Sequence, residues 1–433
     1  MAGDDGDLPI FFSSNDDIFV EILSWLPVIS VLRFRCVCKS WRDIISTSQF
    51  VAKHRAHTND NSKNVLILFK RPYPLPHDWP PIPLRFPRLA DYQSLKKNVG
   101  ATSAAASSAI RSSRRDLEDE FAFDTSLYSS SLVGSSNGLI CLLLDWPRPP
   151  RDYYRCYVNT RLLLWNPSTR TARKLPDIDW FRYNPFYYGF GYDSITQDYK
   201  VLLGGQDPNG CELVAIFALK TGSWKSVEDP LGLEAASLDI HDRGCFLNGA
   251  LHWHEYYCYE DEDWNEDETG YMRTRIVSFD FAQEKFHSFS FIKHKGHMGM
   301  AGGVGTIGNR LFFYTSCYTS TNRPDLEEAG LTIWVMREYG VDQSWTIVAK
   351  IRPEIFPPNV KWLNPIFHME DDGAVLMQSS QGDLVLYTRK EEREKEDTCR
   401  IVLKISDVGE LPARYEETVM YGDTLVSPVI GGG

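Results

Sequence analysis

The sequence has little positive charge and lacks long apolar segments. It holds 46 lysine and arginine residues against 58 aspartate and glutamate residues, which gives a net charge of −12 over 433 residues. Because phosphate contacts need a basic surface, this balance argues against a general nucleic-acid binder. No run approaches the roughly 18 to 20 apolar residues of a membrane-spanning helix. We therefore expect neither nucleic acid nor a membrane as a partner.

The N-terminus lacks the basic residues and the apolar run of a secretory signal. It reads MAGDDGDLPIFF, with acids where such a signal carries lysine or arginine. The nine cysteines are odd in number and scattered from Cys36 to Cys399, which is typical of reduced thiols and not of a disulfide framework. We therefore expect a soluble protein of the cytosol, the nucleus or both.

Changes in composition divide the chain into parts. With 43% apolar and 24% charged residues, it can bury a sizeable core and form two or more domains. The proline-rich RPYPLPHDWPPIPLRFP excludes a helix or a central strand, and GATSAAASSAIRSSRR has the composition of a mobile loop. The expected parts are an N-terminal tail (1–14), a helical module (15–55), a linker with one strand at 64–69 (56–129), a β domain (130–428) and a tail (429–433).

The helical module is predicted from the spacing of its apolar residues. From Asn15 to Leu26 they recur with the period of an α-helix, and Pro27 ends that helix. A second helix is expected over 30–37 and a third over 40–46. Three short helices would form one small bundle.

From about residue 130 onward the pattern is almost entirely β. Short runs of branched and aromatic residues are separated by turn pairs such as Asn137-Gly138 and Asn248-Gly249. Five copies of this pattern are spaced by roughly 50 to 60 residues, which is the scale of four-stranded propeller blades. A sixth blade, closed by NVLILF and the C-terminal YGDTLVSP, would bury the exposed strand edges. The alternative is a β-sandwich, which does not explain the repeat.

The stretch VLRFRCVCKSWRDII at 31–45 crowds two cysteines, four basic residues and one tryptophan into fifteen positions. A zinc site is disfavoured, because Cys36 and Cys38 are one residue apart and no second pair follows at finger spacing. The basic residues are too few for a nucleic-acid surface and are typical of a solvated helix face. We interpret the stretch as part of the helical module.

The run DDIFVEILSWLPVISVLRFRCVCKSWRDIISTSQF closely resembles an F-box, the three-helix module that docks onto the Skp-type adaptor of cullin-based ubiquitin ligases. The segments LLLWNPSTRTARKLP, YGFGYDSITQDYKV, FLNGALHWH and IVSFDF are similar to landmarks of the plant F-box-associated domain. The double glycines Gly204-Gly205 and Gly302-Gly303 resemble those of kelch blades. This resemblance implies a multidomain α+β protein, in which a small three-helix F-box precedes an all-β, kelch-like propeller of about six blades.

The function implied by the resemblance is that of a non-catalytic receptor subunit of a Skp–cullin–F-box ubiquitin ligase. The F-box would bind the adaptor, and the β domain would present an unknown target protein without a cofactor. The residues expected to bind the adaptor are Ile18, Ile22, Leu26, Pro27, Val31, Leu32, Phe34 and Trp41; the alternative for each is the bundle core. Ser14-Asn15 stands where family members carry Leu-Pro, and Ile29 where they carry lysine. If these differences have removed the affinity for the adaptor, the alternative function is that of a non-ligase protein that sequesters a partner through its β domain.

Catalysis by this chain is not expected. His252 and His254 in HWHEYYCYEDEDWNEDE would point the same way on a strand, as a metal pair does, but no third ligand is identifiable. No nucleophile elbow, phosphate loop or paired-carboxylate motif rises above chance. A propeller hydrolase or oxidase would require convergent polar groups at the propeller mouth. The acidic segment 260–268 is either a solvated loop or a surface for a basic target, and the aromatic run at 183–188 is expected to pack between blades.

Overall fold

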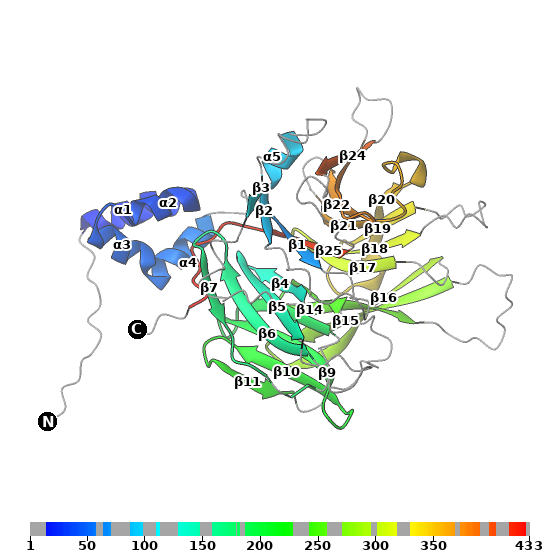
Figure 1. Cartoon of the computed structure of the whole chain (residues 1–433), viewed down its shortest axis with the longest axis horizontal. Coiled ribbons are helices and arrows are strands. Elements are labelled where there is room, and N and C mark those ends of the chain that lie inside the picture. Colours follow the sequence, from blue (N-terminus) through cyan, green and yellow to red (C-terminus); the bar gives the residue numbers. More distant parts are fainter. Residues whose placement is uncertain are drawn as a thin grey trace.

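The computed structural model describes the chain in fifteen segments, and its elements are shown in Figure 1. The described residues are 14–57, 64–70, 87–97, 110–112, 129–147, 158–178, 180–181, 187–227, 242–257, 271–295, 301–317, 330–368, 373–389, 398–403 and 415–429. None of the helices within them is long and apolar enough to cross a membrane.

Within residues 14–57, the three predicted helices are present and a fourth follows them. They are α1 (Ser14–Ser24), α2 (Val28–Phe34), α3 (Lys39–Ser46) and α4 (Ser48–His57). Pro27 ends the first helical segment as predicted and is the N-cap of α2. The second helix therefore begins and ends earlier than predicted. The sequence pattern misses α4 because only Phe50 and His54 of its residues are buried, which leaves no apolar period to detect.

The strands after the helical module form six sheets within the described residues. The first sheet contains β4 (Ser129–Ser136), β5 (Leu139–Pro147), β6 (Val158–Asn166) and β7 (Thr171–Lys174), and the second contains β8 (Tyr187–Asp193), β9 (Asp198–Gln206), β10 (Glu212–Ala218), β11 (Ser223–Ser226) and β12 (Asp242–Arg243). The third sheet contains β13 (Cys245–Leu247), β14 (Ala250–Tyr257), β15 (Tyr271–Asp280) and β16 (Lys285–Lys295), and the fourth contains β17 (Ala301–Ile307), β18 (Arg310–Cys317), β19 (Gly330–Met336) and β20 (Trp345–Ile351).

The remaining two sheets complete the domain. They are β21 (Leu363–His368), β22 (Val375–Ser379), β23 (Leu384–Thr388), β24 (Thr398–Leu403); and β25 (Tyr415–Tyr421), β1 (Asn64–Lys70), β2 (Arg88–Asp91), β3 (Ile110–Ser112). Three short helices are inserted among the described strands, namely α5 (Tyr92–Lys97), η1 (Asp342–Ser344) and η2 (Pro353–Ile355). The pairs within each sheet are antiparallel, except that β12 pairs with β8 in parallel.

The six sheets are the blades of a propeller. The strands β25, β4, β8, β13, β17 and β21 contact one another in this cyclic order and form its inner ring. A closed ring of six sheets, five of them four-stranded and one extended to five strands by β12, agrees with the predicted repeat and excludes the β-sandwich alternative. The all-β domain with six blades, preceded by a small helical module, is confirmed.

The sixth blade is built from both ends of the chain. β1 pairs with β25 along the whole of Asn64–Lys70 and Tyr415–Tyr421. The strand NVLILF therefore closes the ring as predicted. Its expected partner YGDTLVSP was wrong, because only Tyr421 of that segment belongs to β25. β3 pairs with β2 inside the segment predicted to be a mobile loop, so pairing overrides its small-residue composition there. The proline-rich stretch lies outside the described residues, apart from Pro87.

The predicted turn pairs have the backbone that tight hairpins require. Asn137 and Gly138 have φ of 49° and 77°, and Asn248 and Gly249 have φ of 50° and 81°. Type I′ turns need positive φ at both central positions, which asparagine and glycine tolerate best. These local signals therefore fix where the blades turn.

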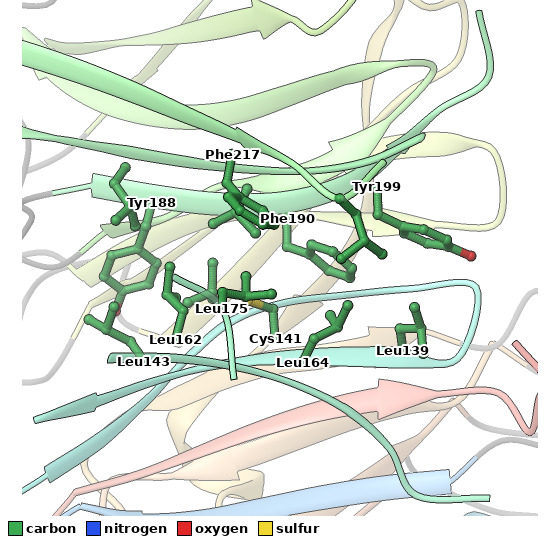
Figure 2. Close-up of a cluster of buried hydrophobic side chains, with 14 residues drawn as sticks. Leu139, Cys141, Leu143, Leu162, Leu164, Leu175, Tyr188, Phe190, Tyr199 and Phe217 are labelled. Atoms are coloured by element: carbon green, nitrogen blue, oxygen red, sulfur yellow. The ribbon is translucent and has the colours of Figure 1, made fainter. Parts of the chain in front are cut away.

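Aromatic side chains fill the spaces between blades. Figure 2 shows Tyr188, Phe190 and Phe217 facing leucines of the preceding blade, including Leu143 and Leu162. Tyr187 points to the other side, where Trp253 belongs to the same buried cluster. The predicted packing of this run is confirmed for Tyr187 and Tyr188, whereas positions 183 and 186 lie outside the described residues.

A buried ion pair links the blade of β8 and β9 to the next one. Lys200 Nζ donates to Asp193 Oδ2 at 2.9 Å and to the carbonyl oxygen of Phe281, directly after β15, at 2.7 Å. The Lys200 and Asp193 side chains are only 6% and 2% exposed. Removing one partner would leave the other charge buried without compensation.

We predict that Lys200→Met lowers the free energy of unfolding by about 3 to 5 kcal/mol, because Asp193 stays buried and loses its cation. The matched control is Lys225→Met, since Lys225 is exposed and contacts Glu284 near the same pair. Its loss should change stability by about 1 kcal/mol or less. Urea unfolding of the three proteins measures this difference, and equal midpoints for both variants would contradict the role assigned to the pair.

Candidate functional site

An exposed row of large apolar side chains runs along α1 and continues onto α2. Ile18, Ile22, Trp25 and Ile29 are 60%, 56%, 63% and 61% exposed. Ile18 and Ile22 are one helical turn apart in α1, Trp25 lies in the turn that follows α1, and Ile29 is in the first turn of α2. We call these four residues the docking row. Several large apolar side chains left exposed in so small a module mark a protein interaction site more often than a solvated face.

The indole of Trp25 is held in place from two sides. Its Nε1 donates to Glu21 Oε1 at 3.0 Å, and its ring stacks on the His57 ring with centroids 4.2 Å apart. Glu21 in turn forms an ion pair with Lys53, and hydrogen bonds from Lys53 and Trp25 keep the pKa of this carboxyl below its ordinary value. Because Trp25 is already ordered, a partner that covers it loses little side-chain entropy on binding.

Behind the docking row lies the core of the helical module. Its buried residues are Leu23, Val28, Val31, Ile44, Ile45, Phe50 and Leu425. Six of these come from the four helices, whereas Leu425 comes from the C-terminal end of the chain. His54 of α4 is buried as well, and its Nε2 lies 2.9 Å from the carbonyl oxygen of Leu26.

The structure separates the eight predicted adaptor-binding residues into three groups. Ile18, Ile22 and Pro27 are exposed. Leu26, Leu32, Phe34 and Trp41 are half-buried and pack against the core. Val31 is fully buried between the helices, which is the core position that the sequence analysis left open as its alternative.

The sequence prediction of docking residues omitted two members of the row, Trp25 and Ile29. The signal for Trp25 was present, since it lies three residues after Ile22 and fits the apolar period expected for the first helix. Ile29 was harder to assign, because Pro27 separates the two helices and breaks the apolar period before it. Phe19 and Val37 are also large apolar residues of the module with high exposure.

A second feature of the module is a groove of about 560 Å³ around the α2–α3 corner. It is lined by Leu32, Arg35, Cys36, Cys38, Lys39 and Arg42. Both thiols are exposed and free, and Cys38 Sγ accepts a bond from the backbone N–H of Trp41 at the start of α3. In the described part of the chain, no three histidine, cysteine or acidic side chains come together as metal ligands.

The two histidines singled out in the β domain are both buried in β14. The carbonyl oxygen of Cys245 can only accept, so His252 donates from Nδ1 to it at 3.3 Å and accepts at Nε2 from the Tyr339 hydroxyl at 2.8 Å. Burial lowers the pKa of His252 to about 4. His252 is thus a neutral structural group between two blades. The acidic segment that follows it lies outside the described residues.

A cavity of about 280 Å³ lies beside Tyr339 on the propeller. It is lined by Asn309, Arg310, Leu311, Met336, Arg337 and Tyr339. Its polar groups are one amide, two guanidinium groups and one phenol hydroxyl.

We predict a pH dependence of stability that originates from His252. Its folded pKa of about 4 lies below its ordinary value of 6.5, so its contribution is complete above pH 6.5 and is lost as pH falls toward 4. His252→Gln should remove a slope of up to about 1.4 kcal/mol per pH unit in this window. Urea unfolding at several pH values measures the slope, and identical pH profiles of the two proteins would refute this account of His252.

Comparison with protein families identifies both parts of the chain. Residues 116–427 match the family model described as F-box associated beta propeller domain, and residues 15–53 match the F-box domain. The two matches cover the propeller blades downstream of residue 116 and the whole docking row. They agree with the resemblance carried by the sequence landmarks.

Curated relatives from Arabidopsis thaliana are similar to the chain over most of its length. F-box/kelch-repeat protein At3g23880 is 25% identical over 376 residues, which is 86% of this chain and 86% of the relative. F-box protein CPR1 is 24% identical over 417 residues, 89% of this chain and 84% of the relative. F-box protein At3g07870 is 24% identical over 416 residues, 87% and 85% of the two chains.

Proposed function

Because this chain belongs to the F-box-associated β-propeller family of plant F-box proteins, we propose that it is the substrate-recognition subunit of a Skp–cullin–F-box ubiquitin ligase. F-box domains bind Skp1-type adaptors, and families of this architecture are generally non-catalytic. The observation that carries the proposal is the docking row, four large apolar side chains left exposed on a module that has its own buried core.

The adaptor is the partner that best accounts for the docking row. A bundle of about forty residues buries too little surface to be stable with a large exposed apolar face, so that face is expected to be covered in the assembled protein. A stable docking of this kind buries roughly 1,500 Å² or more in total. Trp25, ordered by Glu21 and His57, has the character of a central anchor in such an interface.

The propeller is proposed to hold the target protein at the end away from the F-box. Arg55 of α4 lies over the ring of Tyr192, next to the end of inner strand β8, so the F-box sits where the inner strands end. The second strand of each blade ends, and the third begins, at the opposite end. The predicted acidic segment lies outside the described residues.

In this assembly the chain contributes proximity and not bond chemistry. A target held by the propeller presents its lysines at high effective concentration to the conjugating enzyme, whose reactive groups belong to other subunits. The proposed location is the cytosol, the nucleus or both, where exposed thiols such as Cys36 and Cys38 stay reduced.

We predict that Ile22→Asp and Trp25→Asp each weaken binding to a Skp-type adaptor about tenfold or more, because each places a charge in an apolar interface. The matched control is Ile195→Asp, the same kind of change at an exposed apolar residue in a propeller turn. Calorimetric titration of the purified chains with the adaptor measures the affinities. Equal binding of the native chain and both row variants would exclude the docking row as the interface.

The second candidate function is a protein that sequesters its partner through the propeller without a ligase. It is favoured by Ser14-Asn15 at the start of α1, where the resemblance implies Leu-Pro. If this function is correct, the native chain should not co-purify with the adaptor, and the double change Ser14→Leu, Asn15→Pro should create binding. Tight binding by the native chain would eliminate this candidate.

A further inference from the structure

The segment Gly422–Pro428 follows the last strand and runs between the propeller and the F-box. We call it the C-terminal strap. Figure 1 shows it in red, leaving β25 and passing α4 before the chain ends. It has no regular secondary structure, yet Thr424, Leu425 and Pro428 are buried. Burial of an irregular segment requires specific partners for its backbone groups.

On the F-box side, the partner is the core of the helical module. Leu425 is 7% exposed and belongs to the same buried cluster as Leu23, Val31 and Phe50. A residue near the C-terminus thus completes the core of a module that begins at residue 14. The neighbouring Val426 points to the other side and packs against the buried cluster between the blades of β4–β7 and β8–β11.

On the propeller side, the partner is Asn166 in the landmark sequence WNPST. Asn166 is fully buried, and its Nδ2 donates to the carbonyl oxygens of Thr424 at 3.1 Å and Val426 at 2.6 Å. Its Oδ1 accepts from the backbone N–H groups of Ser168 and Thr169. One amide therefore shapes its own turn with its oxygen and binds the strap with its nitrogen.

Two further contacts fix the register of the strap. Ser168 Oγ donates to Asp423 Oδ1 at 2.8 Å. Gly138 has a φ of 77°, and a Cβ at this position would lie 2.4 Å from Thr424 Cγ2 and 2.6 Å from the carbonyl oxygen of Gly422. The Asn137-Gly138 hairpin thus leaves just enough room for the strap to pass.

The F-box also touches the propeller directly, beside the strap. The guanidinium of Arg55 lies 5.1 Å from the centre of the Tyr192 ring. The Tyr192 ring packs on the Tyr199 ring with centroids 4.9 Å apart, and the Tyr199 hydroxyl accepts from Asn137 Nδ2 at 3.2 Å. Arg55, Tyr199 and Asn137 therefore connect α4 to the hairpin that borders the strap.

We propose that the C-terminal strap is a clamp that sets the orientation of the F-box on the propeller, with Leu425 and Asn166 as its positioning residues. Leu425 anchors the strap in one domain, and Asn166 anchors it in the other. A flexible link would let the propeller sample many orientations. Asn166 binds the strap at Thr424 and Val426, the two neighbours of Leu425, and anchors this close together allow only one orientation. The clamp is independent of the ligase proposal. Only its consequence rests on that proposal, namely that a bound target is held at a fixed distance from the adaptor.

The distance between the two domains tests the clamp in the full chain. Fluorophores are placed through unnatural amino acids at exposed Ser40 in α3 and exposed Gln283 in the turn after β15. Single-molecule energy transfer between them should give one narrow distribution in the otherwise native protein. Leu425→Asp should broaden and shift this distribution, because a carboxylate does not stay in an apolar core.

Asn166→Asp is the sharper variant. It keeps the oxygen that accepts from Ser168 and Thr169 but replaces the donor by an acceptor facing the carbonyl oxygens of Thr424 and Val426. The turn should persist while the strap is released, so the same broadening is expected. Circular dichroism verifies that the propeller of each variant is folded.

Two controls match these changes. Val429→Asp introduces the same charge at an exposed position one residue beyond the strap and should leave the distribution narrow. Leu425→Met keeps an apolar side chain of similar volume and should also leave the distribution narrow. An unchanged narrow distribution in folded Leu425→Asp and Asn166→Asp would overturn the clamp. Adaptor binding is titrated separately, and its absence in the native chain would remove the ligase proposal while leaving the distance result intact.

Discussion

The pairing of β25 with β1 is the interaction on which the rest of the structure depends. It joins the C-terminal strand to the first strand after the helical module and closes the ring of blades. The chain then continues directly into the strap, which delivers Leu425 to the F-box core. Neither the ring nor the F-box core is complete until the last fifteen described residues are in place. Such long-range contacts make folding slow compared with that of a helical bundle alone.

The F-box divides its apolar residues between two tasks. Leu23, Val31 and Phe50 hold the helices together, whereas Ile22 and Trp25 of the docking row point away from them. A module this small gains stability from any further buried surface. It obtains some of that surface from the strap on one side, and the adaptor is proposed to supply the rest on the other. Stability and partner recognition therefore draw on the same short helices.

Local features of the sequence predicted most of the fold. Turn pairs such as Asn137-Gly138 are fixed by backbone sterics, and the repeat length indicates four-stranded blades without knowledge of their contacts. Helix α4 and the burial of Val31 were not predictable in this way, because both depend on which face meets a neighbour. The role of Asn166 was the least accessible. Its motif was visible as a landmark, but its partners Thr424 and Val426 lie about 260 positions away.

The most direct test is an experimental structure of the full chain bound to a Skp-type adaptor. We expect the adaptor to cover Ile22, Trp25 and Ile29, and Leu425 to remain in the F-box core with the propeller in one orientation. An adaptor bound elsewhere, or a complex in which the docking row stays exposed to solvent, would exclude the docking row as the adaptor interface.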